Sequence, residues 1–108
     1  KGSKTKAEVS KLLKVDIQDI RDFEIAGLFE FADKAKQMID EVNIERIRVA
    51  AALKHELDVN VAGIEVVLNM RDKMLRMRKD MNSFLDQIRG KLGNRLNDNI
   101  KKLKKKID

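Results

Sequence analysis

The sequence predicts a mostly α-helical protein, in which a small helical head is followed by one long helix that pairs with a second helix. No proline occurs in the 108 residues, so no helix has to break or kink at one. In the second half of the chain, apolar residues recur at alternating steps of three and four, which is the heptad spacing of a coiled coil. They form a predicted dimerisation seam of Val67, Met70, Met74, Met77, Met81, Phe84 and Ile88.

A lone helix cannot bury this seam, so a partner helix is implied. The simplest partner is a second copy of the chain, which predicts a homodimer. The spacing is also compatible with a seam that folds back on the third helix of the same chain. The four methionines of the seam are interpreted as dimer contacts, with an adaptable binding face as the alternative.

Charge is unevenly distributed along the chain. The formal net charge is +6, and 39% of the residues are charged. Residues 89–108 alone carry +6, residues 1–14 carry +4 and residues 15–33 carry −5. The basic tail is interpreted either as a solubilising helix end or as a nucleic-acid or membrane-surface patch. The acidic stretch is either a solvated face or a surface for a basic partner.

Several classes of function find no support in the residue content. Cysteine is absent, which excludes disulfides and thiolate metal sites and fits a cytoplasmic location. His55 is the single histidine, so we expect neither a metal site nor a cofactor. The sequence has no Gly-rich phosphate loop and no nucleophile beside a histidine base, so we expect no enzyme. It also has no apolar run near the roughly 18 residues of a membrane span, and no membrane partner is expected.

Two short helices joined by a tight turn open the chain, which is a helix-turn-helix arrangement. Thr5 and Glu8 have the spacing of a capping box for a helix over residues 5–14. Its inward positions are predicted to be Ala7, Val9, Leu12 and Leu13. Asp16 is placed as the cap of the second helix and Gly27 as its stop. The inward positions of this second helix are predicted to be Ile17, Ile20, Phe23 and Ile25.

The rest of the head is predicted to be a short hairpin or wing over residues 28–39 and a third helix over residues 41–57. The wing prediction rests on apolar residues that precede a small and polar stretch. The predicted inward positions of the third helix are Ile44, Ile47, Ala51 and Leu57. The head therefore spans residues 5–58.

The long helix is predicted to begin after Asn60, its N-cap, and to run over residues 61–89 before Gly90 and Gly93 interrupt it. The apolar spacing then changes to steps of four, a stutter that locally unwinds a left-handed supercoil. The residues at these steps are Ile88, Leu92, Leu96 and Ile100. The tail beyond is either helical against a partner or disordered. Residues 60–108 form the second predicted domain.

Residues 20–28, IRDFEIAGL, are similar to the L-R-x-Y-E-x-x-G-L signature of the MerR superfamily. Residues 45–48, ERIR, stand where the third helix of that superfamily begins. Residues 58–68, DVNVAGIEVVL, resemble a GVNLAG-type turn found in two relatives, the HspR repressors and the CbpM chaperone modulators. The resemblance covers about residues 8–74. It implies a winged helix-turn-helix head and an antiparallel coiled-coil dimer.

One function that the resemblance implies is a dimeric, HspR-like transcriptional regulator that binds DNA. Under this alternative the candidate DNA-binding residues are Gln18, Arg21, Lys34 and Lys36. DNA-binding relatives carry an R-R-Y element that closes the wing, but residues 37–39 read QMI here. Phosphate contacts supply most sequence-independent affinity for DNA, so their loss weakens this interpretation. The acidic second helix weakens it further, because acidic groups are repelled by phosphates.

The leading prediction is therefore a CbpM-like regulatory protein. The resemblance implies that such a protein binds and modulates the J-domain of a DnaJ- or CbpA-like co-chaperone. J-domains present a positively charged helix, and an acidic segment has the complementary charge. The candidate partner-binding residues are Asp16, Asp19, Asp22 and Glu24.

Overall fold

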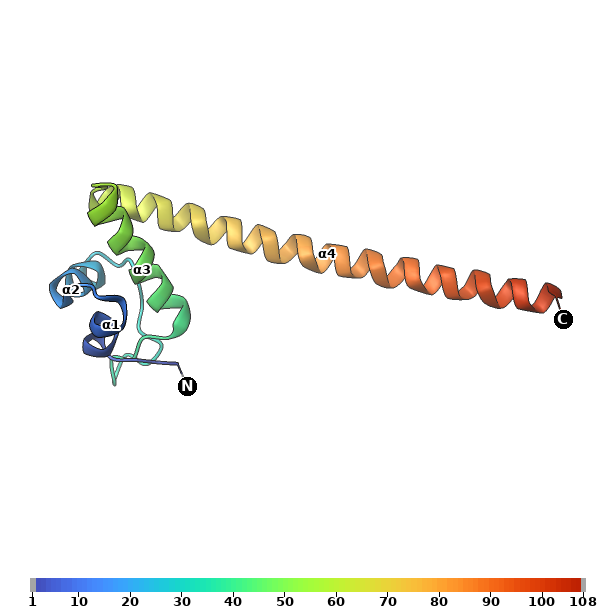
Figure 1. Ribbon diagram of the computed structural model, residues 1–108, viewed down its shortest axis with the longest axis horizontal. Helices are drawn as coiled ribbons and strands as arrows, with labels where there is room; N and C mark the ends of the chain where they lie inside the picture. The colour runs from blue at the N-terminus through green and yellow to red at the C-terminus, as the bar shows by residue number, and fades with distance from the viewer. Residues whose placement is uncertain (1, 108) are drawn as a thin grey trace. The chain divides into compact units, whose positions relative to one another are not determined.

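The computed structural model describes residues 2–107, without the side chain of Ile107, and has four helices and no named strand in this range (Figure 1). The mostly helical fold class is thus confirmed. The chain divides into two compact units, Lys1–Arg71 and Asp72–Asp108. The helices are α1 Lys6–Leu13, α2 Ile17–Ile25, α3 Glu41–Glu56 and α4 Val61–Ile107.

Local capping chemistry fixes where the helices of the head begin. Thr5 and Glu8 form a complete capping box, in which each side chain accepts a hydrogen bond from the backbone N–H of the other residue. The Asp16 carboxylate accepts from the N–H of Gln18 at 2.8 Å and caps α2. The α2 helix ends at Ile25, and Gly27, the residue after its cap, has a φ of +73°, the left-handed conformation that glycine adopts without strain. The predicted caps are confirmed.

The core of the head lies between α2, α3 and the first turns of α4. In Figure 1, α1 packs against α2, and α2 packs against α3. Their fully buried apolar side chains supply most of the hydrophobic stabilisation of this unit. The core consists of Val9, Ile20, Phe23, Leu28, Phe29, Ile39, Ile44, Ile47, Ala50, Ala51, Ile64 and Leu68.

Four predicted inward positions are wrong, because Ala7, Leu12, Ile25 and Leu57 are exposed. A short helix buries only one side: α1 buries Val9, and α2 buries Ile20 and Phe23. Ile25 lies five residues after Ile20 and therefore on the opposite side of α2. Leu57 follows the last residue of α3 and has left the helical face.

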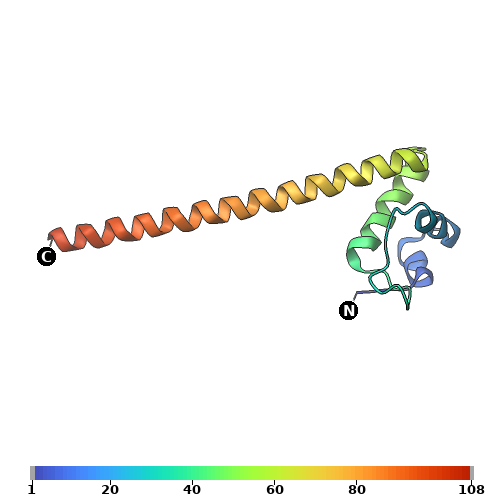
Figure 2. The same cartoon turned by 180° about the vertical axis from the view of Figure 1, so that it is seen from behind.

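The segment between α2 and α3 contains a tight reversal but no extended hairpin (Figure 2). Asp33 and Met38 form an isolated antiparallel bridge, in which the Met38 N–H donates to the Asp33 carbonyl at 3.0 Å. A second bridge joins Lys4 to Ile39, with reciprocal N–H to carbonyl distances of 2.8 and 2.7 Å. In place of the predicted short hairpin or wing, this segment therefore has one tight reversal and takes part in two isolated bridges.

The long helix α4 begins as predicted but does not stop at the glycines. The Asn60 side chain accepts from the N–H of Gly63 at 2.8 Å, which is the predicted cap. The helix then passes through Gly90 and Gly93 and continues to Ile107, so the predicted interruption is wrong. Glycine costs about 1 kcal/mol in a helix interior, too little to end a helix flanked by strong helix formers. The unit boundary lies within α4, because Ile64 and Leu68 are buried in the head.

Candidate functional site

The helix α2 carries most of the predicted functional residues, and it divides them between two sides. Its buried side consists of Asp19, Ile20 and Phe23. Its solvent side consists of Gln18, Arg21, Asp22 and Ile25. The predicted acidic surface is therefore smaller than its sequence suggests.

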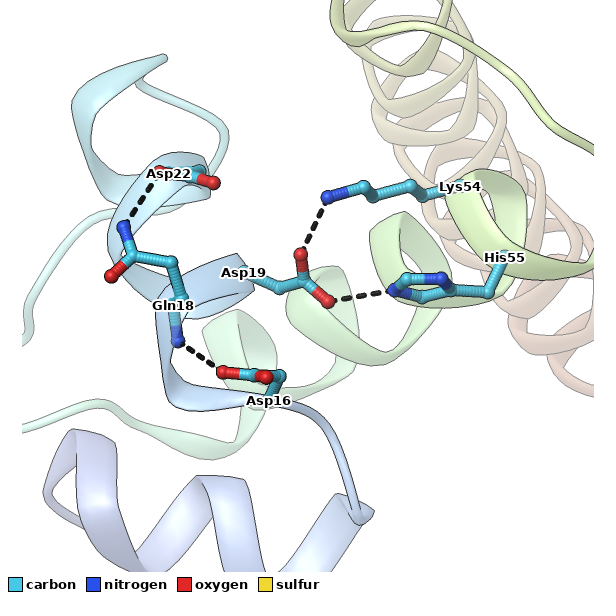
Figure 3. Close-up of polar contacts among 6 residues, drawn as sticks. All are labelled: Asp16, Gln18, Asp19, Asp22, Lys54 and His55. Carbon is cyan, nitrogen blue, oxygen red and sulfur yellow. Dashed lines mark hydrogen bonds and ion pairs between the residues drawn. The ribbon is translucent and has the colours of Figure 1, made fainter.

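Asp19 points into the head, although the sequence predicts it as a partner-binding residue. It is 7% exposed, and its carboxylate accepts hydrogen bonds from Lys54 Nζ at 2.5 Å and from His55 Nε2 at 2.7 Å (Figure 3). Burial acts to raise the pKa of Asp19, but these two hydrogen bonds outweigh it and hold the pKa below the usual aspartate range. The hydrogen bond to Asp19 in turn raises the pKa of Lys54. Asp19 therefore joins α2 to α3 and offers no free charge to a partner.

Glu24 is also engaged within the head. Its carboxylate accepts from Lys6 Nζ on α1 at 2.6 Å, and the same ammonium lies 5.6 Å from the centre of the Phe31 ring. Among the four predicted acids, Asp16 and Asp22 are the exposed ones. Asp16 stands at the start of α2, and Asp22 accepts a hydrogen bond from the Gln18 side chain at 3.1 Å.

Ile25 is an apolar residue on the solvent side of α2 that the sequence interpretation placed in the core. It is 84% exposed, the largest exposure among the large hydrophobic residues of the described chain. It lies one turn beyond Asp22 on the same side of the helix. The solvent side of α2 thus carries an exposed apolar side chain next to an exposed carboxylate. Once Ile20 and Phe23 are known to be buried, the 3.6-residue period of the helix places Ile25 on the solvent side.

Two of the four residues predicted for DNA binding are brought together in the structure. Arg21 from α2 and Lys36 from the reversal line a shallow hollow of about 320 Å³, together with Lys6 of α1. The other lining residues are Thr5, Ala7, Ile17 and Gln37. Lys34 is exposed and Gln18 bonds Asp22, but neither lines the hollow. The sequence interpretation did not include Lys6, which is distant in the chain.

The predicted seam on α4 is exposed from Val67 to Phe84. The exposed fraction runs from 36% for Val67 to 70% for Met77, and only Ile88 is half-buried. Within the described residues, these side chains therefore do not pack into a hydrophobic core. The apolar positions of the basic tail are similarly open, with Leu92, Leu96, Ile100 and Leu103 between 50% and 61% exposed.

His55, on α3, is a hydrogen-bond partner of Asp19 and does not belong to a metal-binding cluster. No group of three or more His, Asp or Glu side chains suited to a metal ion occurs among residues 2–107. Across the same residues, no helix is long and apolar enough to cross a bilayer. No family model, curated protein or solved structure matches this chain.

Proposed function

We propose that the chain is a regulatory protein of the CbpM kind, which binds the J-domain of a DnaJ-type co-chaperone through the solvent side of α2. The observation that carries the proposal is that Asp22 and Ile25 are exposed one turn apart on α2, while Asp16 is exposed at the start of the same helix. Glu30 and Asp33 add exposed negative charge in the following segment.

These exposed residues suit a basic protein surface for two physical reasons. An apolar side chain such as Ile25 gains free energy only when a partner covers it, which phosphate groups cannot do. Exposed carboxylates on the same helix favour a cationic partner and disfavour an anionic one. Arg21 is the single cation of α2. Because Lys54 and Lys6 already pair with Asp19 and Glu24, the negative charge available to a partner here comes from Asp16 and Asp22.

The proposal is tested by measuring the affinity of the full chain for a J-domain fragment, by titration calorimetry at physiological salt. Replacement of Asp16 and Asp22 by asparagine keeps the size of both side chains, and asparagine caps a helix as well as aspartate does. We expect this double variant to bind several-fold more weakly, because it removes the two exposed charges. The matched control, Glu56→Gln with Glu65→Gln, removes two exposed charges outside α2 and should bind as the wild type does.

Ile25→Ala tests the apolar part of the proposed surface. It should weaken J-domain binding by roughly tenfold, the effect of truncating one apolar contact at an interface. Folding should be unaffected, because Ile25 is 84% exposed. Wild-type affinity in both Ile25→Ala and the Asp16/Asp22 variant would refute the proposal.

The alternative is a DNA-binding regulator, and one observation favours it. Arg21, Lys36 and Lys6 line the same hollow, which could accept a backbone phosphate. Lys6 is already paired with Glu24, which reduces the positive charge available there. A duplex-DNA shift that falls steeply with salt and is lost in Arg21→Gln with Lys36→Gln would support the alternative over J-domain binding.

We further propose that the α4 seam pairs with the seam of a second copy in antiparallel orientation. The heptad pattern permits a register in which Val67 faces Phe84, Met70 faces Met81 and Met74 faces Met77 of the other copy. This register leaves every seam residue from 67 to 84 opposite another seam residue.

Charges beside the seam favour this register. It places Lys73 of each copy next to Asp80 of the other copy, which gives two attractive pairs related by symmetry. It also places Arg71 near Arg78, a repulsion that Glu45 offsets because it lies within the field of Arg71. If the register shifts by one heptad in one direction, Asp80 of one copy lies beside Asp80 of the other. A shift by one heptad in the opposite direction places Lys73 of one copy beside Lys73 of the other. A parallel pair would set Lys73 against Arg78.

A further inference from the structure

The last five turns of α4 form an amphipathic and strongly basic helix that the proposed functions do not use. Residues 89–108 carry a net charge of +6, whereas residues 1–88 sum to zero. The tail also presents one apolar stripe, whose large side chains are at least half exposed: Leu92, Leu96, Ile100 and Leu103. Leucines held in water beside lysines imply a partner that is both apolar and anionic.

In the proposed dimer, the α4 helix of a second copy does not cover this stripe. In the antiparallel register above, Val61, the first residue of α4, lies opposite Gly90 of the other copy. The tail beyond Gly90 therefore extends past the paired helix. The apolar spacing changes from heptad steps to steps of four at the same place, and the charge of the chain begins to accumulate there. Direct pairing of two tails would also bring +6 against +6.

We propose that residues 91–106 lie along the surface of an anionic phospholipid membrane. In this arrangement the stripe enters the boundary between headgroups and acyl chains, and the flanking lysines reach the lipid phosphates. A polybasic helix gains roughly tenfold in membrane affinity for every one to two cations near the surface. The sequence expectation of no membrane partner rested on the lack of a spanning segment, which does not bear on a helix that lies in the interface.

The composition of the stripe separates a membrane from two other anionic partners. Nucleic acid binds cations through its phosphates and stacks bases on aromatic side chains, but the last aromatic residue of the chain is Phe84. The hot spots of protein interfaces are enriched in Trp and Tyr, which the tail lacks, whereas leucine is under-represented there. Lipid acyl chains accept leucine and isoleucine without any required shape.

The test compares two double variants of the full chain that remove equal charge from the same segment. At 3.6 residues per turn, Lys104 and Lys106 flank the apolar stripe on its two sides, whereas Lys101 and Lys105 lie on the opposite side of the helix. Binding is measured by co-flotation with vesicles of phosphatidylserine and phosphatidylcholine. Lys104→Gln with Lys106→Gln should lose on the order of tenfold in affinity. The Lys101→Gln, Lys105→Gln control should lose clearly less, and pure phosphatidylcholine vesicles should not bind the wild type.

A third variant, Leu96→Gln with Leu103→Gln, keeps all the charge and removes the centre of the stripe. It should abolish vesicle binding while leaving J-domain affinity unchanged, which keeps this inference separate from the function of α2. Vesicle binding that depends equally on all four lysines and not on the leucines would overturn the proposal. A duplex-DNA shift that depends on the four lysines and not on the leucines, in the absence of vesicle binding, would overturn the proposal in favour of nucleic acid.

Discussion

Asp19 on α2 accepts a 2.5 Å hydrogen bond from Lys54 on α3, across 35 positions of sequence. The pair fixes the crossing of the two helices at a point where His55 also reaches the same carboxylate. A carboxylate that is 7% exposed needs hydrogen-bond partners. Leaving a buried charge unpaired destabilises the folded state far more than forming the pair stabilises it. No buried side-chain nitrogen or oxygen in the described residues lacks a partner.

Replacement of Asp19 by asparagine should destabilise the head by about 1–2 kcal/mol, because a charge-assisted bond becomes a neutral one. The estimate is kept small because Lys54 is partly exposed and water screens its charge. Urea unfolding followed by circular dichroism measures the effect. Asp16→Asn, an exposed replacement that preserves the cap, is the control and should change the free energy of unfolding little. Equal effects of the two substitutions would contradict the structural role of Asp19.

The same pair predicts an acid-dependent stability. The pKa of Asp19 is lower in the folded protein than the value of about 3.9 in an unfolded chain. The unfolded state therefore binds the proton more readily, so the stabilisation is present above that value and is lost as pH falls through the folded pKa. Between neutral pH and acid, wild type should lose more free energy of unfolding than Asp19→Asn. Glu8 and Glu45 also have lowered pKa values, but they titrate in both proteins and cancel in the difference. Parallel pH profiles would exclude a role of Asp19 in acid stability.

Features that depend on neighbouring residues could be predicted from the sequence, because their chemistry is local. The capping box at Thr5, the caps at Asp16 and Asn60, and the stop at Gly27 each involve residues no more than a few positions apart. The mostly helical fold class follows from the same local rules and from the heptad period.

Features that depend on packing between helices could not be predicted in this way. Nothing near Asp19 in the sequence distinguishes it from exposed Asp22, and only the position of α3 makes it internal. The outward position of Ile25 follows from the choice of buried side, which the apolar pattern of a nine-residue helix does not fix. The acidic surface predicted on α2 consequently included two acids, Asp19 and Glu24, that are bound within the head.

Two glycines of α4 should respond in opposite ways to the same substitution. A Cβ at Gly63 would lie 2.7 Å from Val59 Cγ1, and Val59 packs against the core and cannot easily move. Gly63→Ala should therefore destabilise the head by about 1–3 kcal/mol. A Cβ at Gly90 would meet nothing within 4 Å, so Gly90→Ala should stabilise the helix by up to about 1 kcal/mol.

Thermal unfolding followed by helical circular dichroism measures both glycine variants. The midpoint should fall for Gly63→Ala, while helical signal at moderate temperature should rise for Gly90→Ala. A shift of the same sign in both variants would contradict the packing around Gly63.

The proposed antiparallel register predicts a charge-exchange effect at Lys73 and Asp80. Asp80→Lys should weaken the dimer by roughly tenfold, because symmetry converts two attractive pairs into two repulsive ones. Adding Lys73→Asp to the same chain restores both pairs with the signs reversed, so the double variant should dimerise nearly as well as wild type. Sedimentation equilibrium at low salt gives the dissociation constants, and high salt should shrink the difference. In a parallel dimer, or with the helices shifted by a heptad, Lys73 and Asp80 are not neighbours, and the second substitution would not rescue the first.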